Sequence, residues 1–465
     1  MNSFVKRLKS AASPAFELLY LSCVFFMYFE IAVPLPISVF KGLYVGVFIV
    51  LALRVALLRE GTGLLLPSPL RSRRVLLPLF LLLGYLFLDL AGLLYSPVTD
   101  FAASKYLVIA PMLLFLIPTL CYARDEAHLD RLYRTLALSG LAVGLFSLSN
   151  YFVYEFIPLP YIRRLSLIAD YNRYAENLFI TLVLGSYYII NTKLKRRERT
   201  LLLLFHITFF AAVVTLSGSR RTYLLLFPAL AALLLYRSFY IVRYSASERA
   251  AFRRLVLGGV LTACAVLAVF TAQAGFERYS DIKYRQELEN GGGIPTENSV
   301  DTVIDSIATG GMFDKRAVIW QVALETALNY DFPDIIIGRG SGYDAHLYDI
   351  SADSRLAELY ASVEEKPKNW MSPHNFLLAD FLSGGLARLC VSLALLGVVM
   401  IRLAQLFMRR PHRALGLCTV MALVYFNAFI SGRYGFAYDK FYYILLACIV
   451  VEGTLAEHAR ASMER

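Results

Sequence analysis

One histidine stands where a long polar stretch of the chain gives way to an apolar one, in the segment Pro373-His374-Asn375. Histidine is the side chain that most readily accepts a proton near neutral pH, so His374 is a candidate general base for activating a hydroxyl nucleophile. The alternative is that the segment is only a polar cap on a helix that enters an apolar environment. His346, in the same polar stretch, has no comparable context and is expected to lie on the surface.

Arginines near the ends of apolar runs form a second set of candidates. A guanidinium group offers a planar fork that matches phosphate oxygens, and it stays charged at any relevant pH. Arg220 and Arg221 are the clearest pair, because the turn Ser217-Gly218-Ser219 places them between two apolar runs. A single arginine of this kind is equally well explained by contact with phospholipid head groups. Together they predict a site for a polyanion such as a lipid-linked diphosphate; the set is Arg163, Arg164, Arg173, Arg220, Arg221, Arg316, Arg339 and Arg433.

The elements that must position these residues are helices that cross a membrane. Of 465 residues, 58% are hydrophobic and 17% are charged, and the mean hydropathy is +0.57, which excludes a large soluble catalytic domain. Because a transmembrane helix needs about 17–25 apolar residues, the apolar runs predict an all-α polytopic membrane protein with about twelve spans. These are 15–34, 38–58, 75–95, 105–122, 135–157, 176–191, 200–217, 221–237, 255–275, 385–407, 413–431 and 440–456.

Charge predicts how these spans are oriented. The net charge of +11 is attributed to cytoplasmic segments rather than to nucleic-acid binding, since Lys and Arg are enriched on the cytoplasmic side of membrane proteins. Alternate connections carry basic runs, such as those at 6–9, 71–74 and 193–199. Both termini are therefore expected to be cytoplasmic, and His374 and the arginine set are expected to lie on the outer side.

The polar stretch 276–373 is the one place for a folded segment outside the membrane. It contains 17 Asp and Glu against nine Lys and Arg. Within it, 285–299 is expected to be a loop, and apolar residues at helical spacing predict an amphipathic helix over 316–330. The expected organisation is spans 1 to 9 in residues 1–275, the outer loop, and spans 10 to 12 in residues 374–465.

Two further patterns bear on the chemistry. The run 338–342, Gly-Arg-Gly-Ser-Gly, could form a backbone nest for phosphate, but without a preceding strand it is better interpreted as a turn. No cluster of His, Cys and carboxylates has metal-ligand spacing, so neither a metal nor another cofactor is expected. All six cysteines fall in or beside predicted spans, which argues against a disulfide framework.

In this order and topology, these residues resemble those of the bacterial O-antigen ligase family, which belongs to a wider group with O-antigen polymerases and protein O-oligosaccharyltransferases. The family's His-(Asn/Ser/Gln)-x9-Gly-x-x-Gly pattern is matched by His374, Asn375 and Gly385, while Arg388 replaces its final glycine. The pattern lies at the end of the predicted outer loop.

Two other elements carry the same resemblance. The family's Arg-x3-Leu element is matched from Arg220 to Leu224. The helix with an arginine and an aromatic residue in the family's long loop is similar to Arg316 to Trp320, and the glycine turn that follows is similar to 338–342.

The resemblance implies a fold like that of polytopic C-type glycosyltransferases, with one long periplasmic loop, in the bacterial inner membrane. It implies lipopolysaccharide biosynthesis by transfer of O-antigen polysaccharide from undecaprenyl diphosphate to a sugar hydroxyl of lipid A-core, without metal or nucleotide sugar. His374 would be the general base, and a single displacement would invert the anomeric configuration. The expected substrate-binding residues are Arg163, Arg220, Arg221, Arg316, Arg339, Arg433 and Asn375.

Three alternatives remain open at this point. An O-antigen polymerase or a protein O-oligosaccharyltransferase would use the same donor with another acceptor. A flippase or transporter of lipid-linked glycan should place ionisable residues near the middle of the bilayer. Most charges lie at span ends, and Arg54, Asp89 and Arg388 are the exceptions.

Overall fold

The computed structural model describes most of the chain as helix. The described residues are 2–32, 39–58, 73–168, 170–192, 194–219, scattered positions between 222 and 238, 247–289, 311–356, 372–430 and 440–463. Within these ranges the regular elements are helices, and no strand occurs. The predicted span at 221–237 falls largely outside the described residues.

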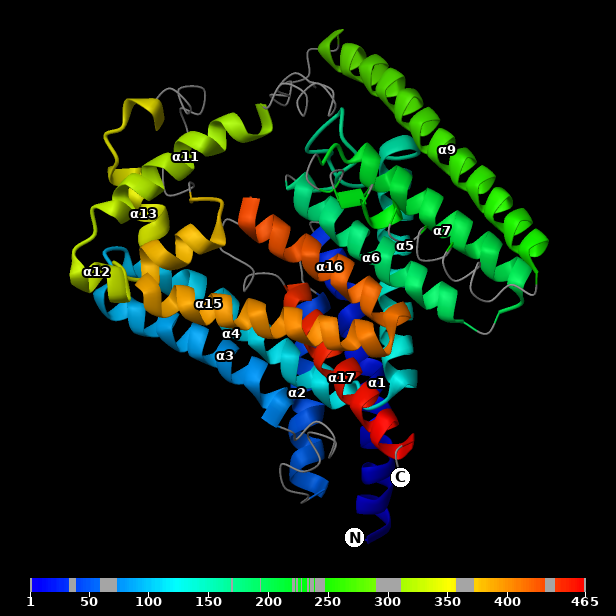
Figure 1. Cartoon of the computed structure of the whole chain (residues 1–465), viewed down its shortest axis with the longest axis horizontal. Helices are drawn as coiled ribbons and strands as arrows, with labels where there is room; N and C mark the ends of the chain where they lie inside the picture. The colour runs from blue at the N-terminus through cyan, green and yellow to red at the C-terminus, as the bar shows by residue number, and fades with distance from the viewer. Residues whose placement is uncertain are drawn as a thin grey trace. The chain divides into compact units, whose positions relative to one another are not determined.

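The helices occur in the following order (Figure 1). They are α1 (Asn2–Ala32), α2 (Val39–Leu58), α3 (Arg73–Ala91), the 3-10 turn η2 (Gly92–Tyr95), α4 (Thr99–Tyr122), α5 (Glu126–Phe152), α6 (Tyr171–Asn191), α7 (Arg196–Leu216), α9 (Glu248–Glu289), α11 (Gly311–Leu328), α12 (Phe332–Ile337), α13 (Tyr343–Ile350), α15 (Phe376–Arg409), α16 (Pro411–Ile430) and α17 (Lys440–Met463). The amphipathic helix expected over 316–330 is confirmed as α11.

Six of the described helical segments are long and apolar enough to cross a membrane. They are Leu77–Tyr95, Glu126–Phe152, Arg197–Leu216, Glu248–Gln286, Phe376–Arg409 and Arg413–Ile430. An α-helix satisfies its backbone hydrogen bonds internally, which is the condition for crossing a bilayer. The predicted class, an all-helical membrane protein, is thus confirmed.

The structure corrects one predicted loop. Residues 285–299 were expected to be irregular, but α9 continues through residue 276, the expected start of the outer loop, to Glu289. The helix extends because its polar last turns, from Glu277 onward, contain good helix formers and no glycine or proline until after residue 290. Residues 290–299 lie outside the described residues.

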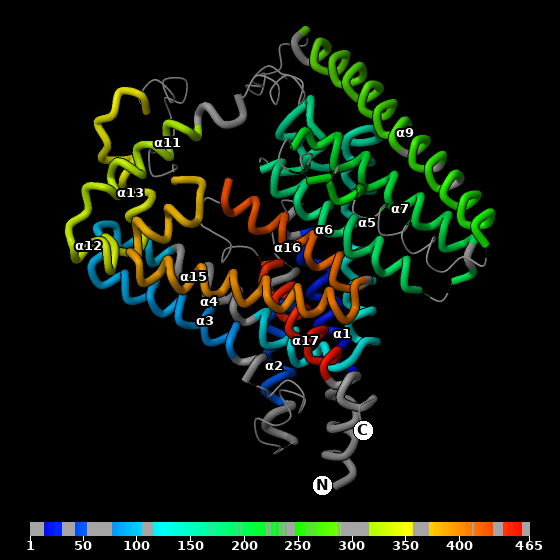
Figure 2. The backbone as a smooth tube through the Cα atoms, in the orientation of Figure 1, coloured from blue at the N-terminus to red at the C-terminus, as the bar shows by residue number. Residues whose placement is uncertain are grey.

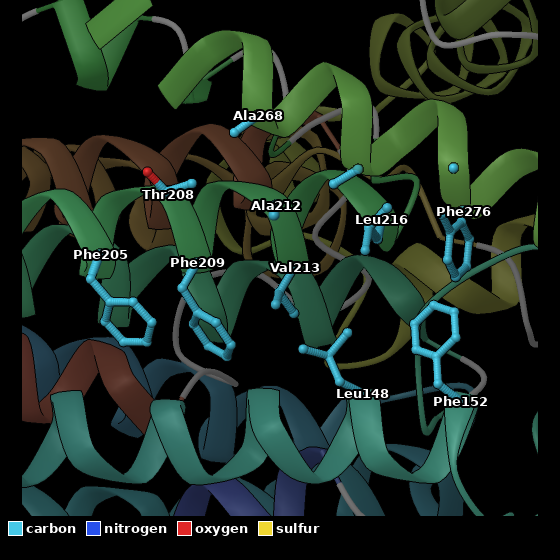
Figure 3. Close-up of a pocket in the computed structure, with 12 residues that line it drawn as sticks. Leu148, Phe152, Phe205, Thr208, Phe209, Ala212, Val213, Leu216, Ala268 and Phe276 are labelled. Atoms are coloured by element: carbon cyan, nitrogen blue, oxygen red, sulfur yellow. The ribbon is translucent and has the colours of Figure 1, made fainter. Parts of the chain in front are cut away.

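The chain divides into two compact units, and neither coincides with the division expected from topology. The first unit comprises residues 1–57 and 129–303. In it α6 packs on α7 at a close approach, where a Cβ on Gly185 would come within 2.4 Å of the His206 ring. Helices α5, α7 and α9 also line a partly open, mainly apolar pocket of about 490 Å³ (Figure 3), to which Phe152 and Phe209 contribute.

The second unit comprises residues 58–128 and 304–465. Its centre is α15, which packs against α3, α16 and α17 and against the short helices α11, α12 and α13. The trace shows α3 and α15 running alongside each other (Figure 2). Ile319 and Ala323 of α11 are buried with Tyr348 of α13 and Leu382 of α15, so the predicted amphipathic helix packs on the rest of the unit through its apolar face.

A break inside α15 receives the turn between α12 and α13. Gly385 has φ 58° and ψ −158°, which interrupts the helix. Gly338 ends α12 with φ 68°, and a Cβ placed on it would come within 2.5 Å of the backbone of Ser383 and Gly384. The two backbones meet here because neither glycine has a side chain.

Hydrogen bonds confirm the interpretation of 338–342 as a turn. The Arg339 N–H donates to the Leu382 carbonyl (3.1 Å) and the Gly340 N–H donates to the Ser383 carbonyl (3.0 Å). The Ser341 N–H donates to the Gly92 carbonyl at 3.1 Å. These donors are occupied by α15 and η2, so in this arrangement they do not form a phosphate nest.

Gly338→Ala is expected to destabilise the protein by at least about 2 kcal/mol, because a Cβ disfavours positive φ and would collide with the α15 backbone. Gly397→Ala is the matched control, since a Cβ at that position of α15 meets nothing within 4 Å. Thermal unfolding in detergent, followed by helix circular dichroism, measures both. Equal melting temperatures for the two variants would contradict the close contact.

Candidate functional site

The backbone around His374 is held in an unusual conformation. Among the described non-glycine residues, His374 alone has a positive φ, at 50°. Its N–H donates to the Ser372 hydroxyl at 3.4 Å. Residues in sparsely populated conformations tend to gather at functional sites, where the surroundings hold them. This backbone conformation fixes the direction in which the His374 side chain projects from the backbone.

Asn375 begins α15 as its N-cap. Its side-chain oxygen accepts hydrogen bonds from the N–H groups of Leu377 (3.0 Å) and Leu378 (3.3 Å), and the residue is buried. Two otherwise unsatisfied donors of the first turn are thereby paired. Asn375 was expected to bind substrate. In the structure its carboxamide oxygen caps α15 immediately after His374.

Helix α11 supports the same segment from the other side. The Trp320 indole N–H donates to the Pro373 carbonyl at 2.7 Å, and the Trp320 ring lies 6.0 Å from that of Phe429 on α16. Arg316 is one turn earlier on α11, and residues four apart share a helix face. The segment that carries His374 and Asn375 is thus bonded to the helix that carries Arg316, and we call residues 372–376 together with the Arg316–Trp320 face of α11 the His374 corner.

Arg339 is engaged within its own loop. Its Nε is 2.5 Å from Asp334 Oδ2 and its Nη1 donates to the Tyr343 hydroxyl at 2.8 Å, while the guanidinium lies 4.6 Å from the centre of the Tyr330 ring. Burial alone would lower the pKa of Arg339, but these hydrogen bonds raise it above its ordinary value overall. Through these contacts the Arg339 guanidinium links the 338–342 turn to α12 and α13.

The first unit holds Arg163, which was also predicted to bind substrate. Arg163 Nη2 is 3.1 Å from Asp281 Oδ1 on α9, and its guanidinium lies 4.5 Å from the centre of the Tyr284 ring. Arg163 thus has an acidic partner within the chain. Its expected contact with a donor phosphate stays a prediction.

The turn that leads to Arg220 is also in the first unit. Gly218 has φ 69°, and its carbonyl accepts a hydrogen bond from Arg164 Nη1 at 3.2 Å. The Ser219 hydroxyl donates to Asn172 Oδ1 at 2.9 Å. Arg220, Arg221 and Arg433 lie outside the described residues, so their predicted roles stay predictions.

A buried polar cluster within the second unit was not assembled from the sequence. Asp89 and Arg388 were noted as charges inside predicted spans, and the structure pairs them through Arg388 Nη1 and Asp89 Oδ1. Arg388 Nε is 3.0 Å from Asp380 Oδ1, and Arg388 Nη2 donates to the Tyr85 hydroxyl at 2.7 Å. We call these four residues the Arg388 cluster. The sequence signal for this cluster was an acidic residue, Asp89, in one apolar run and a basic residue, Arg388, in another.

Hydroxyl groups complete the Arg388 cluster and connect it to the α12–α13 turn. The Tyr85 hydroxyl donates to Asp380 Oδ1 at 2.8 Å, and Ser392 donates to Asp380 Oδ2. The Ser341 hydroxyl lies 2.5 Å from the Asp89 carbonyl and 2.8 Å from its Oδ1. Asp380 therefore faces Arg388, Tyr85 and Ser392.

Asn375→Ala is expected to lower the stability of the protein by about 1 kcal/mol through loss of the helix cap, whereas Asn375→Ser should retain most of it because a serine hydroxyl can accept the same bonds. Thermal unfolding of the two variants gives the comparison. A melting temperature of Asn375→Ala equal to that of the unsubstituted protein would show that the cap is not what this side chain contributes.

Within the described ranges, no group of three or more His, Cys, Asp and Glu side chains is arranged to hold a metal ion. Comparison of the chain with models of known protein families gives no match. Comparison with curated protein sequences gives no significant match either.

Proposed function

We propose that this protein is a membrane glycosyltransferase of the O-antigen ligase type. It transfers O-antigen polysaccharide from undecaprenyl diphosphate to a sugar hydroxyl of lipid A-core. The His374 corner is the observation that carries this proposal: a histidine with positive φ lies between a capped helix start and a tryptophan hydrogen bond, and Arg316 is one helical turn before that tryptophan. A proton acceptor and a phosphate-binding cation are the two groups that this chemistry requires.

The proposed setting is the bacterial inner membrane, with twelve spans and both termini in the cytoplasm. The segment between α9 and α15 forms the periplasmic loop, and its described part contains α11, α12 and α13. Packing of α11 and α13 on α15 supports this arrangement, since it joins the proposed loop to the helix of the predicted tenth span. The architecture is that of a polytopic C-type glycosyltransferase.

In the proposed reaction, His374 accepts the proton of the acceptor hydroxyl as its oxygen attacks the anomeric carbon of the donor. The new carbon–oxygen bond forms as the bond to the diphosphate breaks, and undecaprenyl diphosphate leaves with the electron pair. Arg316 stabilises the charge that develops on the leaving diphosphate. One direct displacement inverts the anomeric configuration.

The pairing of Asp89 with Arg388 bears on the transporter alternative. A transport pathway was expected to show ionisable residues near the middle of the bilayer, and pairing of two of the three does not decide between the two functions, since such residues commonly pair. The polymerase alternative shares the donor and the chemistry, so it is distinguished by the acceptor on which glycan appears.

His374→Ala is expected to reduce glycan transfer at least about 100-fold, the range lost when a general base is removed. The assay mixes purified protein in detergent with undecaprenyl-diphosphate-linked glycan, lipid A-core and a chelator, and product is read as a glycan ladder on a gel. His346→Ala, a histidine of α13, is the matched control and should retain activity. Transfer by His374→Ala at the unsubstituted rate would remove the base assignment, and longer glycan on the carrier instead of on lipid A-core would indicate a polymerase.

Arg316→Ala is expected to raise the donor concentration needed for half-maximal transfer, and Arg316→Lys should restore only part of the loss because lysine lacks the planar fork. Arg355→Ala is a suitable control, since Arg355 pairs with Glu325 and Asp353 within the same unit. Initial rates over a range of donor concentrations give both values. The same donor dependence in all three variants would exclude Arg316 from diphosphate binding.

A further inference from the structure

The Arg388 cluster has an unbalanced charge. Among the residues that the structure describes, it combines one guanidinium, on Arg388, with two carboxyl groups, on Asp89 and Asp380. All three residues are at most 7% exposed, and they lie in helices that are long and apolar enough to cross a membrane. With both carboxyls ionised, the cluster would carry one net negative charge.

The neighbouring groups do not supply a second positive charge among the described residues. The titratable groups closest to the cluster are Tyr85 on α3, Tyr95 on η2, Asp344 on α13, whose carboxylate accepts from Ser383, and Tyr442 on α17. A tyrosine is neutral at neutral pH, and Asp344 adds no positive charge. Among the residues that the structure describes, the donors that contact the two carboxyls, apart from Arg388, are the neutral hydroxyls of Tyr85, Ser341 and Ser392.

A second buried cluster in the same unit shows how the chain balances charge elsewhere. Glu452 is fully buried, yet its Oε1 is 2.6 Å from Arg413 Nη1 and its Oε2 is 3.7 Å from Arg410 Nη1. Glu126 contacts both of these arginines. Two guanidiniums therefore meet two carboxylates, and no excess charge is left.

An uncompensated charge in an apolar interior is so costly that the group takes up a proton instead. The Ser341 hydroxyl is a neutral donor to Asp89, at 2.5 Å from its carbonyl oxygen and 2.8 Å from the Oδ1 that also pairs with Arg388.

We propose that the Arg388 cluster is a proton-binding site that holds one proton at neutral pH, shared between Asp89 and Asp380. The proton comes from bulk water and converts one carboxylate to a carboxylic acid, which makes the cluster neutral. Ser341 connects the same cluster to the α12–α13 turn. This inference does not depend on the proposed transferase activity.

Infrared difference spectroscopy tests the charge count. A protonated carboxyl group has a carbonyl absorption separate from that of carboxylate, and it shifts when water is replaced by D2O. The unsubstituted protein at pH 7 should show this absorption. Asp89→Asn and Asp380→Asn should each lose one carboxyl equivalent of it, because removal of either acid leaves one carboxylate for Arg388. Arg388→Gln should gain one equivalent, because both remaining acids must then be neutral.

Glu452→Gln is the matched control, since its cluster is already balanced and its spectrum in this region should equal that of the unsubstituted protein. Helix circular dichroism verifies that each variant is folded. If Arg388→Gln does not fold, the spectra of Asp89→Asn and Asp380→Asn are sufficient for the test. Absence of the absorption from the unsubstituted protein would overturn the proposal. Its retention at full intensity in either asparagine variant would do the same.

Discussion

The close contact of two backbones at Gly338 and Gly385 is the constraint on which the second unit depends. Because neither residue has a Cβ, the α12–α13 turn lies directly on the break in α15 and hydrogen-bonds to carbonyls that the break exposes. A break in a helix leaves backbone groups that need partners. The turn provides them, so the contact joins a periplasmic loop, in the proposed topology, to a membrane helix.

The remaining contacts of α15 extend from this point in both directions. Toward its start, Asn375 caps the helix, and Trp320 fixes the residue before His374. One turn beyond the break, Arg388 bonds to Asp89 and Tyr85 on α3. The segment from His374 to Arg388 is therefore held at both ends and in the middle. Such rigidity is what a general base requires, since proton transfer depends on hydrogen-bond distances.

Much of the architecture could be predicted from the sequence, because hydropathy reports directly on which segments can lie in a membrane. The helices, the amphipathic α11 and the turn at 338–342 follow from local composition. The extension of α9 to Glu289 was missed, because polar helix formers after an apolar run look like a loop when hydropathy alone is considered. The cap formed by Asn375 matches the alternative that the sequence left open for the segment 373–375, and the sequence could not assign it because capping and substrate binding use the same amide.

The local sequence pattern could not predict which residues far apart in the chain are in contact. Asp89 and Arg388 are separated by 299 residues, and each alone resembles an isolated charge in an apolar run. Only their contact reveals that Asp380 adds a second acid and that the charges do not balance. Arg339 shows the converse, since its position predicted a free cation and the fold gives it Asp334 as a partner.

The most direct test of the His374 corner as a catalytic site is an electron cryomicroscopy structure of the protein with a bound polyprenyl diphosphate. Diphosphate density within hydrogen-bonding distance of Arg316, with its terminal phosphate facing the imidazole of His374, is the result expected. Diphosphate bound to the protein at a site that neither Arg316 nor His374 contacts would contradict the account.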